Sequence, residues 1–155
     1  MIKKILIANR GEIACRIAAS CERLGIAAAT IHSSADKDAR HVRVIGESLE
    51  VGGAVANESY LNQAAVIAAA KHFQCDAIHP GYGFLSENAE FCGAVEAAGL
   101  IFIGPTVEAL EQFGDKASAK IRALAAGVPV IPGSDGQSSD TAELQSIVQK
   151  MTLPV

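Results

Sequence analysis

Residues 5–32 read ILIANRGEIACRIAASCERLGIAAATIH, which is the pattern of a strand, a helix and a second strand. The runs 5–8 and 27–32 are largely apolar and do not alternate between inside and outside residues, which is typical of strands covered on both faces. Between them a helix is predicted over residues 11–24, ending at Gly25. Its predicted apolar face consists of Ile13, Ile17, Cys21 and Leu24. Such a unit predicts a parallel sheet.

The same unit recurs along the chain. Further strands are predicted at residues 47–51, 76–79 and 101–103, and helices at residues 61–72 and 87–98. Asn62 is a candidate N-cap of the first of these helices, and Ser86 is the predicted N-cap of the second. The predicted apolar face of the second helix consists of Phe91, Val95 and Ala98. Residues 1–113 are therefore predicted to form one doubly wound α/β domain.

The pattern changes after residue 113. Gly114-Asp115-Lys116 opens a helix predicted over residues 117–126, and an extended passage follows over residues 128–136. A second helix is predicted over residues 141–151, with Leu144, Ile147, Val148 and Met151 aligned on one face. The last residues, 153–155, are typical of a strand that begins here, so we expect the natural protein to continue.

Composition and charge narrow the class of protein. Half of the 155 residues are hydrophobic and 19% are charged, which is enough for a folded core. The net charge is −4 and lysine and arginine do not cluster, so neither nucleic acid nor a basic membrane-binding face is expected. No apolar stretch approaches the roughly 18 residues needed to span a bilayer. Without a transit peptide before Ile2, a bacterial, cytoplasmic protein is expected if Met1 is the native start.

The four cysteines do not form a recognisable metal or disulfide pattern. Cys15, Cys21, Cys75 and Cys92 include no CxxC pair and have no histidine at metal-ligand spacing. We expect them to be reduced, mostly buried and apolar in behaviour.

The loops after the first and fourth strands are the candidate site. In an open parallel sheet, ligands bind beyond the carboxyl ends of the strands where the strand order reverses. If the order is 3-2-1-4-5, these loops are neighbours, and Arg10 and Tyr82 should lie on adjacent loops. The first loop carries one glycine, Gly11, where a dinucleotide fingerprint needs three, and the chain has no Walker A motif.

The loop over residues 79–88 leaves two interpretations open. Gly81 and Gly83 flank Tyr82 and permit positive φ or close approach of another backbone. The loop is either a tight turn with Tyr82 packed down or a wall that faces a ligand. His79, directly before a proline, is interpreted as a hydrogen-bonded structural histidine rather than a general base.

Charged side chains near these loops leave alternatives open as well. Glu87 lies in the first predicted turn of a helix, where a carboxylate suits the helix dipole without any function. Arg10 and Glu12 could pair with each other or with Glu87, and a solvated arrangement is equally consistent with the sequence.

The motifs taken in order resemble biotin carboxylases over essentially the whole chain. Each motif alone is weak, and their combination is highly specific. They are Ile7-Ala8-Asn9-Arg10-Gly11-Glu12-Ile13-Ala14, Arg16-Ile17, His32-Ser33-Ser34-Ala35-Asp36, Tyr60-Leu61-Asn62, Ala77-Ile78-His79-Pro80-Gly81-Tyr82-Gly83-Phe84-Leu85-Ser86-Glu87-Asn88, Phe102-Ile103-Gly104-Pro105, Gly114-Asp115-Lys116 and Pro132-Gly133-Ser134.

This resemblance implies a fold and an activity. Residues 1–113 correspond to a Rossmann-like pre-ATP-grasp domain, and residues 114–155 to a truncated lead-in to an ATP-grasp domain. The complete enzyme would be an ATP-dependent ligase that uses Mg²⁺, ATP and bicarbonate, by way of carboxyphosphate, to carboxylate biotin held on a partner carrier domain. The glycine-rich lid, the metal-binding glutamates and the bicarbonate- and biotin-holding arginines would follow residue 155.

The resemblance also implies roles for particular residues. Lys116 is the one nucleotide contact that it carries onto this chain, and a mobile ammonium suits phosphate oxygens; without the resemblance Lys116 is a solvated surface lysine. Tyr82, Gly83 and Glu87 correspond to a wall facing biotin and bicarbonate. No catalytic residue and no metal ligand falls within the 155 residues, so the chain alone is expected to be inactive and to bind no cofactor tightly.

Partners follow from the same resemblance. They are the remaining ATP-grasp and C-terminal domains, a biotin carboxyl carrier domain, a carboxyltransferase and a second copy in a homodimer. The alternative is a non-catalytic Rossmann-like module of another ATP-grasp ligase, which a glycine-rich lid following in the parent gene would exclude.

Overall fold

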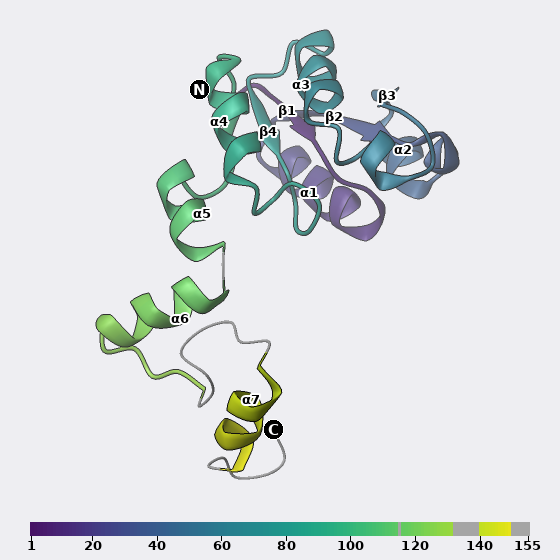
Figure 1. The fold of residues 1–155 in the computed structure, drawn as a ribbon. Coiled ribbons are helices and arrows are strands. Elements are labelled where there is room, and N and C mark those ends of the chain that lie inside the picture. The colour runs from purple at the N-terminus through teal and green to yellow at the C-terminus, as the bar shows by residue number, and fades with distance from the viewer. Residues whose placement is uncertain (115, 132–139, 150–155) are drawn as a thin grey trace. The chain divides into compact units, whose positions relative to one another are not determined.

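Five parallel strands form one sheet in the order β3-β2-β1-β4-β5, which confirms the predicted topology (Figure 1). The computed structural model describes residues 1–114, 116–131 and 140–149. The strands are β1 (Lys4–Ile7), β2 (Ala27–His32), β3 (Ser48–Glu50), β4 (Ala77–His79) and β5 (Ile101–Phe102). The centre of the sheet is in register through Leu6, which lies beside Ala29 of β2 and Ile78 of β4. The order reverses beside β1, so β1 and β4 flank the switch point.

Helices connect the strands and continue the chain beyond them. The α-helices are α1 (Gly11–Arg23), α2 (Arg40–Ile45), α3 (Gln63–His72), α4 (Ala89–Ala97), α5 (Val107–Phe113), α6 (Lys116–Ala125) and α7 (Thr141–Gln149), with 3-10 turns η1 (Ser34–Asp36) and η2 (Ala56–Glu58). The sequence pattern does not predict α2, α5, η1 or η2. The helices α2 and α5 are only six and seven residues long, too short for a clear apolar periodicity.

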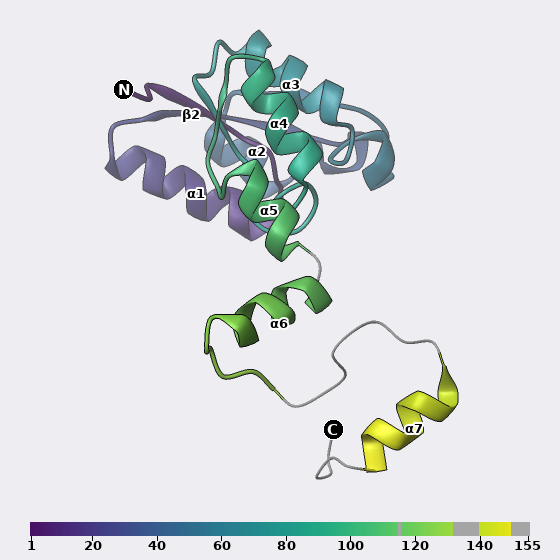
Figure 2. The ribbon, with the colours of Figure 1, turned by 60° about the vertical axis from the view of Figure 1, so that its left-hand side comes forward.

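One face of the sheet is covered by α1 and α2. Ile5 and Ile7 of β1 pack in one buried cluster with Ile13 and Ile17 of α1, because alternate residues of a strand point to the same face. The helix α2 contacts both α1 and β2. Figure 2 shows α1 on one side of the strands and α3 and α4 on the other.

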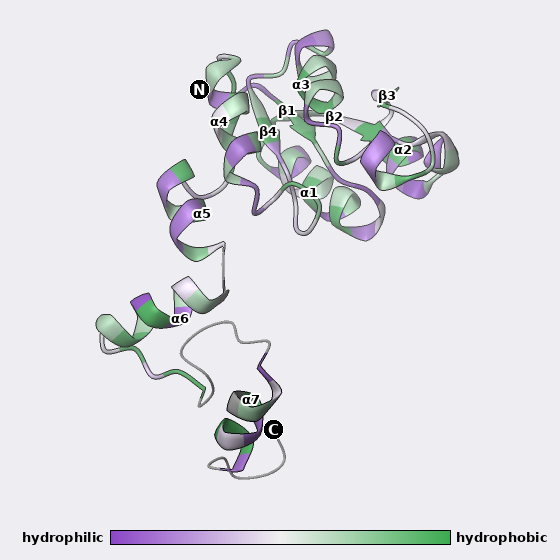
Figure 3. Cartoon of the chain, in the orientation of Figure 1, coloured by the Kyte–Doolittle hydropathy of each residue, from purple (hydrophilic) through white to green (hydrophobic). Residues whose placement is uncertain are grey.

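The opposite face is covered by α3 and α4. Phe102 of β5 shares its register with Ile78 of β4 and meets Phe91 of α4 edge to face, with ring centroids 6.0 Å apart. Phe91 and Ile78 are fully buried. Hydrophobic colour accordingly follows the central strands in Figure 3. Both faces are thus apolar, as the unbroken apolar runs predict.

Two details of the predicted helices are wrong. Leu24 is 73% exposed rather than on the apolar face of α1, because α1 ends at Arg23 and Leu24 is its C-cap; Ile26 packs against the cluster instead. The N-cap of α4 is Asn88, not Ser86: Asn88 Oδ1 accepts a hydrogen bond from the Phe91 amide at 2.7 Å. Leu85 is buried, and two turn hydrogen bonds surround it: the Ser86 amide donates to Gly83 O, and the Asn88 amide donates to Leu85 O. Because of this turn, the helix begins two residues later than predicted. The predicted Asn62 cap of α3 is confirmed.

The chain divides into two compact units, Met1–Val107 and Glu108–Val155. In the second unit, α6 is followed by Gly127 with φ +72°, whose amide donates to Leu124 O, as the predicted helix end requires. The predicted residues 150–151 of the last helix, the 132–134 motif and the strand at 153–155 lie outside the described residues. In the part of the chain that the structure describes, no helix is long and apolar enough to cross a bilayer.

Candidate functional site

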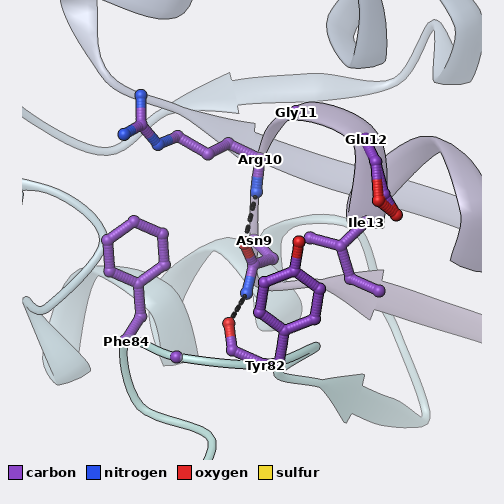
Figure 4. Close-up of a pocket in the computed structure, with 8 residues that line it drawn as sticks. Asn9, Arg10, Gly11, Glu12, Ile13, Tyr82 and Phe84 are labelled. Carbon is purple, nitrogen blue, oxygen red and sulfur yellow. Dashed lines mark hydrogen bonds between the residues drawn. The ribbon is translucent and has the colours of Figure 1, made fainter.

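A pocket lies at the switch point of the sheet, between the β1–α1 loop and the β4–α4 loop. It has a volume of about 380 Å³ and is lined by Asn9, Arg10, Gly11, Glu12, Ile13, Tyr82, Gly83 and Phe84. Figure 4 shows Tyr82 and Phe84 rising from one loop toward the segment that begins α1. The prediction that Arg10 and Tyr82 lie on adjacent loops is therefore confirmed.

Asn9 joins the two loops. Its side-chain Nδ2 donates to Pro80 O at 2.7 Å and to Tyr82 O at 2.9 Å. Its Oδ1 accepts from the Arg10 amide at 2.9 Å. Asn9 is only 3% exposed, and buried amide groups are stable when their hydrogen-bonding capacity is used. One asparagine thus fixes the spacing of the pocket walls.

The β4–α4 loop has an unusual backbone. Gly81 and Gly83 have φ of +70° and +66°, and Phe84, a non-glycine residue, has φ +45°. Bulky residues rarely adopt positive φ, because the Cβ atom crowds the backbone. Tyr82 is 64% exposed, so the interpretation in which it packs down is wrong. The loop presents Tyr82 and the Gly83 backbone to the pocket.

Arg10 pairs with Asp36 and not with Glu12 or Glu87. Its Nη1 lies 3.5 Å from Asp36 Oδ2, and both glutamates are exposed. Arg10 has extended backbone immediately before α1, which sends its side chain away from Glu12, as Figure 4 shows. The guanidinium passes over the Phe84 ring, with Cζ 5.9 Å from the centroid.

Asp36 and Tyr60 form a hydrogen-bonded centre behind Arg10 and Phe84. The Tyr60 hydroxyl donates to Asp36 Oδ2 at 2.7 Å and accepts from the Ser33 amide at 3.0 Å. Ser33 Oγ also donates to Asp36 Oδ2, at 3.0 Å. The Tyr60 ring is 2% exposed and stacks on Phe84, with centroids 5.0 Å apart and an interplanar angle of 17°.

The ionisation of this centre follows from its contacts. Burial works to raise the pKa of the Asp36 carboxyl, but hydrogen bonds from Tyr60 and Ser33 and the charge of Arg10 outweigh burial, so the pKa lies below its usual value. Burial, followed by the hydrogen bond to Asp36, raises the pKa of Tyr60 to about 12. At neutral pH the pair is a carboxylate and a neutral phenol.

His79 is hydrogen-bonded, as predicted. Its Nδ1 accepts a hydrogen bond from the Gly81 amide at 3.0 Å. Burial, together with the charge of Arg16, lowers the pKa of His79. A neutral imidazole that accepts from the following loop fixes the turn after β4.

The other predicted site residues have different positions. Tyr82 and Gly83 line the pocket, whereas Glu87 is exposed and is not among the lining residues. Lys116 is the first residue of α6, in the second unit, and its side chain lies outside what the structure describes. The sequence patterns assign no role to Asn9, Asp36 or Tyr60. Asp36 and Tyr60 follow β2 and β3 at the carboxyl edge of the sheet, and that position is the signal that could have indicated them.

The fold and the pocket define a class of protein. A doubly wound parallel sheet with a small-molecule-sized cavity at its switch point is typical of α/β ligand-binding domains. Among residues 1–114, 116–131 and 140–149, no three His, Cys, Asp or Glu side chains gather as metal ligands would.

The chain belongs to the family of the biotin carboxylase N-terminal domain. The family model "Biotin carboxylase, N-terminal domain" matches residues 1–110. The biotin carboxylase of Haemophilus influenzae is 49% identical over 156 residues, which cover 100% of this chain and 35% of that protein. The chain spans about a third of the length of the curated biotin carboxylases it matches.

Solved structures agree with the family assignment. A biotin carboxylase–β,γ-ATP complex from Campylobacter jejuni is 45% identical with a TM-score of 0.88, covering 99% of this chain and 34% of that one. The biotin carboxylase domain dimer of Hydrogenobacter thermophilus 2-oxoglutarate carboxylase, in complex with MgADP, ADP and bicarbonate, is 42% identical with a TM-score of 0.87. It also covers 99% of this chain and 34% of the other.

Proposed function

We propose that this chain is the N-terminal part of a biotin carboxylase, which uses MgATP and bicarbonate to carboxylate biotin on a carrier domain. The observation that carries the proposal is similarity to a biotin carboxylase over the entire chain, at 49% identity. The alternative, a non-catalytic module of another ATP-grasp ligase, has no comparable support.

The domain division is part of the proposal. Residues 1–113 would form the pre-ATP-grasp domain, and residues 114–155 would begin the ATP-grasp domain. Two boundaries near residue 113 support this division. The family model ends at residue 110, and the boundary between the two compact units falls between Val107 and Glu108 in the sequence. The partners would be the other domains of the same enzyme, a biotin carrier domain, a carboxyltransferase and a second copy of the enzyme.

Within the first unit, the residues that line the pocket at the switch point are proposed to form one wall of the biotin and bicarbonate site. Its volume of about 380 Å³ suits a small bicyclic ligand. Tyr82 offers an exposed aromatic face, and Gly83 has no Cβ atom between its backbone and the pocket. Glu87, which follows these residues in the β4–α4 loop but does not line the pocket, would also face the ligand. MgATP supplies the phosphoryl group that activates bicarbonate, and Lys116 would contact its phosphates; the described residues offer no cluster for the metal.

A chimera tests the function directly. The chain would replace the aligned third of the Haemophilus influenzae biotin carboxylase, and ATP hydrolysis would be measured with free biotin and bicarbonate. We expect phosphate release that depends on both. A folded chimera with a normal melting temperature and no biotin-dependent hydrolysis would contradict the proposal.

The role of Lys116 is tested in the same chimera. Lys116→Met should raise the KM for ATP by roughly 10- to 150-fold, because one charge-assisted contact to phosphate contributes about 1.5–3 kcal/mol. Lys71→Met, at an exposed position of α3, is the matched control and should leave this KM unchanged. An equal KM for ATP in the two variants would mean that Lys116 is a solvated surface lysine and does not contact the phosphates.

A further inference from the structure

Four side chains from four separate segments meet behind one wall of the pocket. Arg10 comes from the β1–α1 loop, Asp36 from η1, Tyr60 from the segment after η2, and Phe84 from the β4–α4 loop. Arg10 and Phe84 line the pocket, whereas Asp36 and Tyr60 are not among its lining residues. Asp36 and Tyr60 can therefore affect the pocket only through Arg10 and Phe84.

The backbone of Phe84 needs support from its ring. Its φ of +45° is an unfavourable conformation for a bulky residue, and such conformations persist where the surroundings hold them. The ring is held by the Tyr60 ring, 5.0 Å away, and by the Arg10 guanidinium, 5.9 Å away. Aromatic stacking and cation–π contacts both depend on geometry, so they fix position as well as add stability.

Asp36 connects Tyr60 and Arg10, the two residues that hold the Phe84 ring. Its Oδ2 accepts from the Tyr60 hydroxyl at 2.7 Å and lies 3.5 Å from Arg10 Nη1. The other contact of the Tyr60 hydroxyl, to the Ser33 amide, joins this pair to the end of β2. A tyrosine serving only as a core residue would need one acceptor for its proton, and a neutral carbonyl would suffice. Here the acceptor is a carboxylate that also holds the guanidinium of the pocket wall.

We propose that Asp36 and Tyr60 are positioning residues of the candidate site, which hold Arg10 and Phe84 so that Tyr82 and Gly83 face the ligand. The role in ligand binding rests on the proposed function, with the biotin ring system as the ligand. The positioning itself is a property of these 155 residues and is tested separately.

The first test uses the 155-residue chain and amide hydrogen exchange. Asp36→Asn removes the charge that holds Arg10, and Tyr60→Leu removes the stack on Phe84. Both should accelerate exchange at the amides of Ser86 and Asn88, whose turn hydrogen bonds close the loop, by about fivefold or more. The strand β1 should keep its protection. Asp38→Asn, two residues along at an exposed position, is the control. Unchanged exchange in both variants would overturn the proposal.

The second test measures the connection between Asp36 and Tyr60 directly. The chain has two tyrosines, so in a Tyr82→Phe background Tyr60 alone gives the phenolate absorbance. Its titration midpoint should lie at about 12 and should fall when Asp36→Asn is added. A raised folded-state pKa means that the stability from this contact is complete below the unfolded pKa of roughly 10. It is lost as the pH rises through the folded-state value. A midpoint that Asp36→Asn does not lower would also count against the proposal.

The third test uses the chimera and separates positioning from general stability. Asp36→Asn and Tyr60→Leu should each raise the KM for free biotin by about five- to tenfold and leave the KM for ATP unchanged. Tyr60→Phe, which keeps the stack on Phe84 but lacks the hydroxyl that donates to Asp36, should recover only part of the loss. A lower kcat with both KM values unchanged would indicate less folded enzyme and overturn the proposal. If the parent chimera shows no biotin-dependent hydrolysis, the proposed function fails, and the exchange and titration results alone decide the positioning role.

Discussion

Gly81 and Gly83 both have positive φ, yet they have different surroundings. A Cβ atom added at Gly81 would lie 2.7 Å from Asn9 Nδ2, whereas one added at Gly83 would meet nothing within 4 Å. Gly81 is therefore required both for its backbone conformation and for the close approach of Asn9. Gly83 is required for its conformation alone.

This difference predicts unequal effects of the same substitution. Gly83→Ala should lower the free energy of unfolding by about 1–2 kcal/mol, the cost of a left-handed conformation with a Cβ atom. Gly81→Ala should cost about 1–2 kcal/mol more, because it also displaces a doubly hydrogen-bonded amide. Urea unfolding of the two variants measures the difference. Equal losses would mean that Asn9 does not join the loops in solution.

At the residue scale, the sequence predicted the pocket wall better than its supports. The Gly81-Tyr82-Gly83 spacing marks an unusual backbone by itself, so Tyr82 and Gly83 could be singled out. Asn9 reaches Pro80 across 71 positions of sequence, and Arg10 reaches Asp36 across 26. Such contacts are created by the strand order, which local patterns do not encode.

At the element scale, burial explains which predictions succeeded. All five strands were predicted, most of them from apolar runs, because both faces of a parallel strand are apolar. Their order came from analogy with doubly wound folds and not from these runs. The start of α4 was wrong by two residues, since Ser86 and Asn88 are both suitable caps by residue type. Asn88 is the cap because Leu85 is buried and lies in a turn, which places Asn88 in the extended backbone that an N-cap requires.

The two cap candidates give a matched prediction. Asn88→Ala should lower the free energy of unfolding by about 1 kcal/mol, because the Phe91 amide loses its side-chain acceptor. Ser86→Ala should change it by less than about 0.5 kcal/mol. Thermal or urea unfolding compares the two. A larger loss for Ser86→Ala would show that the helix begins earlier in solution than in the structure.

At the scale of the whole molecule, the sheet and its pocket lie in one unit, and Lys116 begins a helix of the other. The chain corresponds to about a third of its biotin carboxylase relatives. The resemblance assigns the glycine-rich lid, the metal ligands and the bicarbonate-holding arginines to the remaining two thirds. These 155 residues should therefore fold without supplying a complete nucleotide site.

The last prediction is that the chain by itself does not turn over ATP. Transfer of a phosphoryl group requires several cationic groups and metal ions around the charge that develops, in a site closed to water. A single lysine in water contributes little binding, because neither desolvation nor preorganisation strengthens its charge. Calorimetry of the 155-residue chain should show no MgATP binding tighter than roughly millimolar, and biotin-dependent phosphate release should stay at background. The chimera, titrated in parallel, should bind MgATP, which shows that the assay detects a complete site. Tight binding by the chain alone would mean that residues 1–155 hold the whole nucleotide site.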